Sequence, residues 1–116
     1  MIGHVAIEIR RDDADACLHF WRLLGFEQIA PPRALAERAA WVQAAGTQIH
    51  LLFTEPPFVA PQGHVAVIAQ DYDATLEALS AAGFTVQPRT EHWGSPRCFV
   101  RCPAGHRVEV MAFAPS

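Results

Sequence analysis

Apolar side chains occupy every second position in several short segments of the chain. These segments are HVAIEI (4–9), QIHLLF (48–53), HVAVIA (64–69) and RVEVMA (107–112). Successive side chains of a β-strand point to opposite faces of a sheet, so this period of two predicts strands that bury one face.

The two segments with helical spacing belong to an internal repeat. Residues 13–26 (DADACLHFWRLLGF) align without a gap with residues 71–84 (DYDATLEALSAAGF), at an offset of 58 (71 − 13). Two Asp residues, an Ala, a Leu, a Gly and a Phe coincide. A repeat of this length indicates two copies of one supersecondary unit, with helices near 13–24 and 73–82.

The residues shared by the two copies suit the ends of helices. Asp13 and Asp71 are expected to cap the N-termini, where a side-chain oxygen accepts a hydrogen bond from a free backbone N–H. Gly25 and Gly83 stand where a helix ends in a left-handed residue. An extended segment is expected to follow each glycine.

Each half therefore predicts a strand, a helix and three strands, which is a βαβββ module of an α+β fold. Residues 1–116 are expected to form a single domain, with module one at about 1–54, a linker at about 55–63 and module two at about 64–116. The predicted strands are 2–9, 26–30, 39–45, 47–53, 64–70, 84–88, 97–102 and 106–113.

Four metal-ligand side chains lie on the strand face opposite the larger apolar residues. The repeat pairs His4 with His64 at an offset of 60 (64 − 4), and His50 with Glu109 at an offset of 59 (109 − 50). Three imidazoles and one carboxylate suit a divalent metal ion such as Zn, Fe, Ni or Mn. In five- or six-coordination they leave positions open for water or substrate. A lone strand histidine is more often a surface residue, so the prediction depends on the pairing.

Two carboxylates are the candidate catalytic residues. Glu109 is one, in addition to its role as a ligand. Glu8 is the other, because it follows His4 by four positions on the same strand face. It is expected to act as a general base or to orient a ligand imidazole, unless it lies at a solvated strand end.

A rival zinc site consists of His92, Cys98, Cys102 and His106. The two cysteines are four positions apart in an extended segment, which does not match the C-x₂-C spacing of zinc knuckles. Cys102 also remains a candidate nucleophile near Glu109. The long Arg97, Arg101 and Arg107 side chains flank the last strands and are expected to be solvated, unless one meets an anionic substrate.

The whole pattern resembles the vicinal oxygen chelate superfamily, which includes glyoxalases, bleomycin-resistance proteins and extradiol dioxygenases. The segment FVRCPAGHRVEV (99–110) is similar to the family ending aromatic-x-x-Asp-Pro-x-Gly-x-x-x-Glu, with Cys102 in place of Asp. The resemblance implies an eight-stranded mixed β-cup with helices on its outer face. It also implies ligands on the first and last strand of each module, which are His4, His50, His64 and Glu109.

Several positions depart from particular members of this superfamily. His50 stands where glyoxalase I usually has Glu and where the epimerases tend to have Gln. Glu8 stands where glyoxalase I tends to have Arg. Fosfomycin-resistance enzymes use a Lys and a Tyr near the last module. This chain has no Lys, and Tyr72 is its single Tyr. The resemblance therefore implies a metal-dependent lyase, isomerase or oxygenase that acts on a small oxygenated metabolite. A non-catalytic bleomycin-resistance-like binding protein is the alternative, and a metal-free structural dimer is the third possibility.

Composition restricts the partners. The net charge of −3 argues against nucleic-acid binding, and no apolar run reaches the ~18 residues that span a membrane. Three cysteines, an odd number without a secretory segment, indicate reduced thiols and a cytoplasmic protein. A small-molecule substrate is expected. The resemblance to short members of the superfamily also implies a homodimer, with metal sites that can be shared between the subunits.

Overall fold

The computed structural model describes all residues from Met1 to Ser116, and the chain forms two compact units. The first comprises Met1–Val59 and the second Ala60–Ser116. The boundary lies inside the segment 55–63 that the sequence predicts as a linker. Each unit is described by itself.

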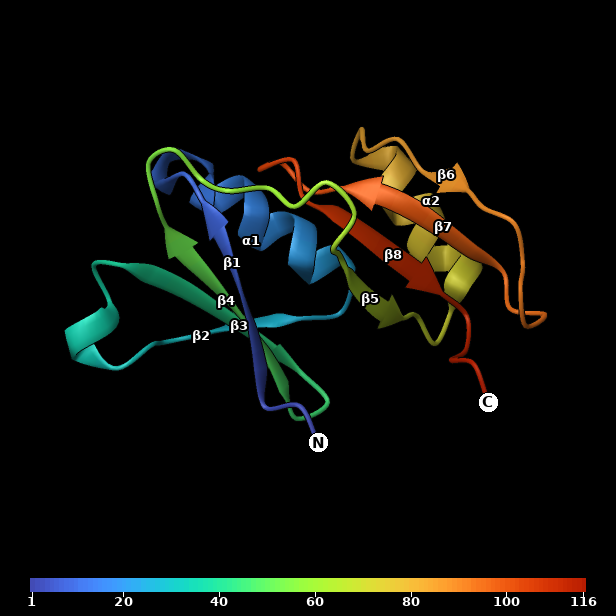
Figure 1. Cartoon of the computed structure of the whole chain (residues 1–116), viewed down its shortest axis with the longest axis horizontal. Coiled ribbons are helices and arrows are strands. Elements are labelled where there is room, and N and C mark those ends of the chain that lie inside the picture. The colour runs from blue at the N-terminus through green and yellow to red at the C-terminus, as the bar shows by residue number, and fades with distance from the viewer. The chain divides into compact units, whose positions relative to one another are not determined.

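The first unit is a four-stranded mixed sheet with one α-helix (Figure 1). The strand order is β1-β4-β3-β2, where β1 is parallel to β4 and the other pairs are antiparallel. Its elements are β1 (His4–Ile9), η1 (Arg11–Asp13), α1 (Ala14–Leu23), β2 (Glu27–Ile29), η2 (Arg33–Leu35), β3 (Ala39–Ala44) and β4 (Thr47–Phe53).

The second unit repeats this topology. Its strand order is β5-β8-β7-β6, again with the first and last strands parallel. Its elements are β5 (Val65–Ile68), α2 (Tyr72–Ala81), β6 (Gln87–Pro88), β7 (Arg97–Arg101) and β8 (Arg107–Met111). Two βαβββ modules in an α+β fold are therefore confirmed.

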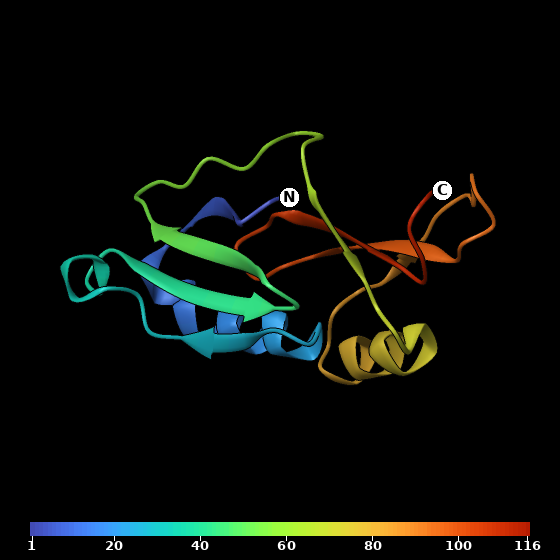
Figure 2. The same cartoon turned by 90° about the horizontal axis from the view of Figure 1, so that it is seen from below.

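Each helix covers one face of its own sheet (Figure 2). In the first unit, Phe20 and Trp21 of α1 are fully buried, as are Ile49 and Leu51 on the strand face predicted to be apolar. The burial of these large side chains is the main stabilising contribution to the module. The opposite face carries His50 beside Trp41 in the first sheet, and Glu109 beside Phe99 in the second. Neither helix is long and apolar enough to cross a membrane.

Both helices end in the same left-handed turn. Gly25 and Gly83 have a φ of 92° each. After them, the N–H of Phe26 donates to the carbonyl of Trp21, and the N–H of Phe84 donates to the carbonyl of Leu79. This is the Schellman arrangement, and it confirms the prediction made from the repeated Gly-Phe pair.

Two details of the sequence prediction are wrong. Asp13 makes no side-chain capping bond, because it belongs to the 3₁₀-turn η1 and its own backbone N–H donates to Arg10. The strand expected at 84–88 is reduced to Gln87–Pro88. The N–H of Phe84 is already bonded to the end of α2, so it cannot join the strand ladder.

The contrast between the two aspartates gives a test. Asp71 accepts a hydrogen bond from the N–H of Ala74 at 3.1 Å, whereas Asp13 caps nothing. We expect Asp71→Ala to lower the free energy of unfolding by about 1 kcal/mol, and Asp13→Ala by less than about half of that. Urea denaturation followed by circular dichroism measures both. Equal losses would mean that the Asp71 cap contributes nothing.

Candidate metal centre

The strand register places an aromatic group on one face of the first sheet. His50 on β4 lies opposite Trp41 on β3 and opposite Ala6 on β1. His4 is two positions before Ala6, so it shares the same face. This is the face that the alternation in the sequence assigns to the ligands.

The three rings stack in a row. The Trp41 and His50 ring centroids are 3.8 Å apart with an interplanar angle of 1°, and the His50 and His4 centroids are 4.0 Å apart with an angle of 12°. His50 is 8% exposed, whereas His4 is exposed. The stack fixes the planes of both imidazole rings. The lone pairs and N–H bonds of the ring nitrogens lie in these planes and are directed away from the stacked faces.

The surroundings of His50 favour its neutral form. Burial, and then the neighbouring His4, lower the pKa of His50 from its usual value. The Nε2 atom of His50 lies 2.8 Å from Oε1 of Gln48, the residue opposite His4 in the sheet. A neutral imidazole held by an amide has the lone pair that a metal ion requires.

The second unit holds the carboxylate. Glu109 lies on β8, between Ala66 on β5 and Phe99 on β7, and is 7% exposed. His64 immediately precedes β5 and is two positions before Ala66. The same alternation that places His4 beside His50 therefore places His64 beside Glu109.

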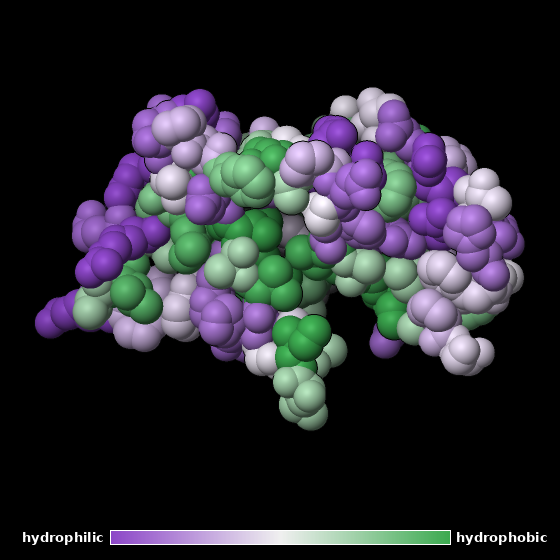
Figure 3. Space-filling view, in the orientation of Figure 1, coloured by the Kyte–Doolittle hydropathy of each residue, from purple (hydrophilic) through white to green (hydrophobic).

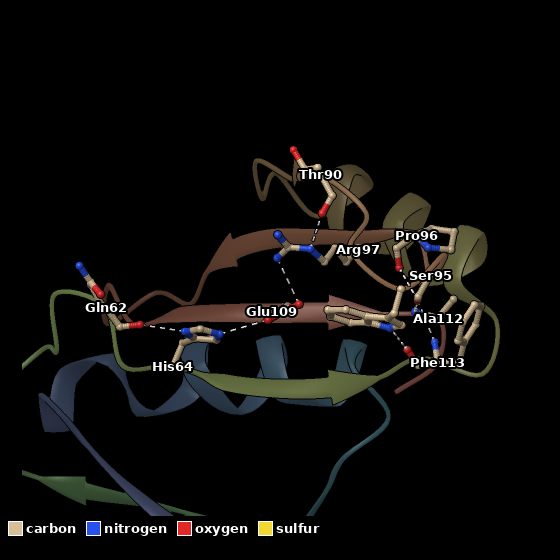
Figure 4. A network of polar contacts seen from close by, with 10 residues as sticks. Gln62, His64, Thr90, Ser95, Pro96, Arg97, Glu109, Ala112 and Phe113 are labelled. Carbon is tan, nitrogen blue, oxygen red and sulfur yellow. Dashed lines mark hydrogen bonds and ion pairs between the residues drawn. The ribbon is translucent and has the colours of Figure 1, made fainter. Parts of the chain in front are cut away.

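Both oxygens of the Glu109 carboxylate are engaged (Figure 4). Nε2 of His64 lies 3.1 Å from Oε1, and Nη1 of Arg97 lies 3.3 Å from Oε2. Nε of Arg97 also donates to the carbonyl of Thr90 at 2.7 Å, which fixes the guanidinium. The carboxylate is thus oriented by one cation and faces an imidazole.

The tautomer of His64 follows from its other nitrogen. Nδ1 lies 2.8 Å from the backbone carbonyl of Gln62, which can only accept, so Nδ1 carries the proton. In the neutral ring, Nε2 then presents a lone pair toward Oε1 of Glu109. Two acceptors 3.1 Å apart need a proton or a metal cation between them.

The structure brings the predicted ligands together in two pairs, one in each unit. His4 contacts His50, and His64 contacts Glu109. No group of three or more His, Cys, Asp or Glu side chains lies in an arrangement that could hold a metal ion. The four-ligand set therefore remains a prediction.

Glu8 contacts the linker. Its Oε1 accepts a hydrogen bond from the N–H of Phe58 at 2.8 Å. Its place on the His4 face agrees with the sequence prediction, but the contact gives the carboxylate a structural role beside any catalytic one.

The rival cysteine site has a different environment. Cys98 is 0% exposed and Cys102 is 4% exposed. Cys98 lies opposite Val110, on the face away from Glu109, and hydrogen bonds with Tyr72 of α2. Burial raises the pKa of the Cys98 thiol, so the thiolate that binds zinc is disfavoured. The same burial raises the pKa of Tyr72 well above its usual value.

Sequence reasoning missed three neighbours of the ligands. The sequence pattern does not predict Trp41 or Gln48 as neighbours of His50. Arg97 was expected to be solvated, yet its side chain is only 12% exposed and pairs with Glu109. The strand register accounts for the first of these contacts, because Trp41 lies directly opposite His50.

Comparisons with known proteins agree with this architecture. The model of the glyoxalase-like domain family matches residues 5–111. A protein from Bacillus anthracis assigned to the glyoxalase family has 24% identity and a TM-score of 0.85, covering 96% of this chain and 93% of its own. Lactoylglutathione lyase from Agrobacterium tumefaciens has 20% identity and a TM-score of 0.73, covering 96% and 92%. The oxidase ChaP-H2 has 16% identity and a TM-score of 0.78, covering 100% and 95%.

These similarities define the class of protein. The chain has the α+β fold of the vicinal oxygen chelate superfamily. It belongs to the glyoxalase-like domain family, whose model spans nearly all of it. No curated protein matches the sequence.

Proposed function

We propose that the protein is a divalent-metal-dependent enzyme that acts on a small oxygenated metabolite able to chelate the metal through two oxygens. The observation that carries the proposal is the contact between two atoms of metal-ligand type, Nε2 of His64 and Oε1 of Glu109, which lie 3.1 Å apart. Adjacent ligands about 2.0–2.2 Å from one metal ion lie roughly 3 Å from each other. The donor chemistry therefore fits a metal.

The ligands would be His4 and His50 from the first module, with His64 and Glu109 from the second. The metal would be Zn, Fe, Ni or Mn, which accept imidazole and carboxylate donors. If two chains share the sites, a two-fold homodimer would carry two equal ones, so either arrangement gives one metal ion per chain. A bound ion would supply Lewis-acid stabilisation of negative charge on a substrate oxygen.

The surrounding residues have definable tasks in this proposal. Arg97 holds Oε2 of Glu109, and so directs Oε1 toward His64. The carbonyl of Gln62 fixes the tautomer that exposes Nε2. Glu109 and Glu8 are the candidate groups for proton transfer. The reaction would be a lyase, isomerase or oxygenase reaction.

One observation favours an alternative, a non-catalytic bleomycin-resistance-like protein that binds a small molecule. Arg97 alone balances the charge of Glu109 without any metal, and Nε2 of His64 can donate a hydrogen bond to Oε1 when it carries a proton. In that case the carboxylate is a structural ion pair, and the sheet face is a binding surface only.

A metal-dependent turnover screen separates the two functions. Tag-free protein is stripped with a chelator, reloaded with each of the four metals, and mixed with hemithioacetals, catechols and α-hydroxy acids. We expect turnover of at least one class that disappears on stripping and returns on reloading. Binding that is equal in stripped and loaded protein, with no turnover for any metal, would support the alternative.

A further inference from the structure

All four arginines of the second unit belong to one face of its sheet. Arg97 and Arg101 lie two positions to either side of Phe99 on β7, so they share the face of that ring. Arg107 lies directly opposite Arg101, on β8. The N–H of Arg89, the residue after β6, donates to the carbonyl of Arg97. The four side chains therefore come from three neighbouring strands.

Three of the four guanidinium groups gather around the Phe99 ring. The Cζ atom of Arg107 lies 4.6 Å from the ring centroid. The Cζ atoms of Arg89 and Arg97 lie 5.4 and 5.6 Å from it, so no two of the three are farther apart than the sum of these two distances, 11.0 Å. This separation is close to the Debye length of about 8–10 Å in ordinary buffers, so the three positive charges repel one another.

A single carboxylate pairs with these arginines. Glu109 lies 3.3 Å from Nη1 of Arg97 (Figure 4). Arg101 donates to a backbone carbonyl. Neither Arg89 nor Arg107 takes part in an ion pair. Four guanidinium groups against one carboxylate leave an excess of three positive charges (4 − 1) on this face.

The other acids of the second unit do not balance this charge. Asp71, Asp73 and Glu77 belong to α2 or its N-cap, and this helix covers the opposite face of the sheet (Figure 2). Glu91 is exposed in the segment before β7 and pairs with no arginine. On the open face, hydrophilic side chains cover much of the surface over β6 and β7 (Figure 3). The positive charge is therefore concentrated on the face that α2 leaves open.

The placement of Arg101 opposite Arg107 is unfavourable for the sheet itself. Like charges directly opposite each other on neighbouring strands destabilise the strand pair. An anion bound beside them would reduce this repulsion. Guanidinium groups bind carboxylates and phosphates through paired N–H donors, which gives such an anion a defined geometry.

We infer that Arg107 and Arg89 bind the anionic group of the substrate, which is a carboxylate or a phosphate. The identification of this anion as part of the substrate rests on the proposed function, whereas the anion site itself does not. Arg107 is two positions from Glu109 on the same face of β8, which is roughly 7 Å along the strand. The substrate class thus narrows from small oxygenated metabolites to short acids and phosphate esters.

Calorimetric titration tests the inference with three probes that need no turnover. The probes are inorganic phosphate, butyrate and the neutral butyramide, titrated at low and constant ionic strength. The protein is stripped of metal and freed of chelator, so no probe can bind through a metal ion. We expect phosphate or butyrate to bind at least about tenfold more tightly than butyramide, because only the anions can pair with guanidinium groups. Whichever anion binds more tightly identifies the anionic group as a phosphate or a carboxylate.

Variants locate the binding. Arg107→Gln should weaken binding of the preferred anion at least about tenfold, and Arg107→Lys should retain part of the affinity, since it keeps the charge without the paired donors. Arg89→Gln changes an exposed residue outside the strands and tests the same site if Arg107→Gln fails to fold. The matched control is Arg22→Gln, at an exposed position of α1 in the first unit, which should leave all affinities unchanged.

Other results would overturn the inference. These are equal affinity for butyrate and butyramide, no saturable binding of either anion, or parental affinity in both Arg107→Gln and Arg89→Gln. Tighter binding of a single-stranded oligonucleotide than of either anion would also overturn it, because the face would then bind nucleic acid. Metal-dependent turnover by a protein that binds neither anion would disprove the inference and leave the proposed function intact. Anion binding by a protein that retains no metal after reconstitution would disprove the proposed function and leave the anion site.

Discussion

Glu109→Gln should weaken metal binding by more than about 100-fold, since even residues that only orient a ligand contribute 10- to 100-fold to affinity. The substitution keeps the shape of the side chain and removes its charge. Glu109 is buried and its Oε1 faces His64, so the loss of its charge falls directly on the proposed site. Metal affinity is measured by competition with a chelator of known strength.

Controls separate this effect from unfolding. Loss of the Glu109 charge leaves Arg97 without its partner, which by itself destabilises the second unit. His64→Ala tests the same site from a more exposed position, and should weaken binding similarly. Glu77→Gln and His19→Ala make the same chemical changes at exposed helix positions and should have no effect. Unchanged affinity in both site variants would exclude Glu109 and His64 as ligands.

Trp21→Ala should lower the free energy of unfolding by about 3–5 kcal/mol, which is a large part of the stability of a small domain. Trp21 is fully buried and makes edge-to-face contacts with Phe20 and Phe26 at centroid distances of 5.5 and 5.3 Å. Its removal leaves a large cavity under the first sheet. Urea denaturation followed by circular dichroism measures the loss.

A second substitution at this position refines the test. Nε1 of Trp21 is buried and has no hydrogen-bond partner, which costs on the order of 1–3 kcal/mol in the native protein. Trp21→Phe removes that group, so we expect it to lose less than half of what Trp21→Ala loses. Phe58→Ala, at a residue that is 68% exposed, is the control and should cost under about 0.5 kcal/mol. A small effect of Trp21→Ala on the free energy of unfolding would show that the burial of this α1 side chain contributes little to stability.

The repeat is the reason that so much of the fold is predictable. It assigns helices and strands to both modules at once, and the Gly25 and Gly83 turns have the same φ. The exceptions are local hydrogen-bond choices. Asp13 enters a 3₁₀-turn, while Asp71 caps its helix, although both are repeat-equivalent. The periodicity of apolar residues and the composition do not predict which backbone group a side chain hydrogen bonds with.

The site is predictable only at the level of single strands. Alternation places His4 with His50, and His64 with Glu109, on their respective faces. It does not give the register between strands, and therefore missed the stacking of Trp41 on His50 and the pairing of Arg97 with Glu109. Arg97 also shows why composition misleads, because a partner far along the chain decides whether an arginine is solvated.

Elemental analysis of tag-free protein tests the metal centre most directly. The protein is purified without chelators, reconstituted with Zn, Fe(II), Ni or Mn, and freed of unbound metal. A site with two ligands from each module predicts about one tightly bound metal ion per chain. Less than about a tenth of an ion per chain with every metal would contradict the assignment of His4, His50, His64 and Glu109 as ligands.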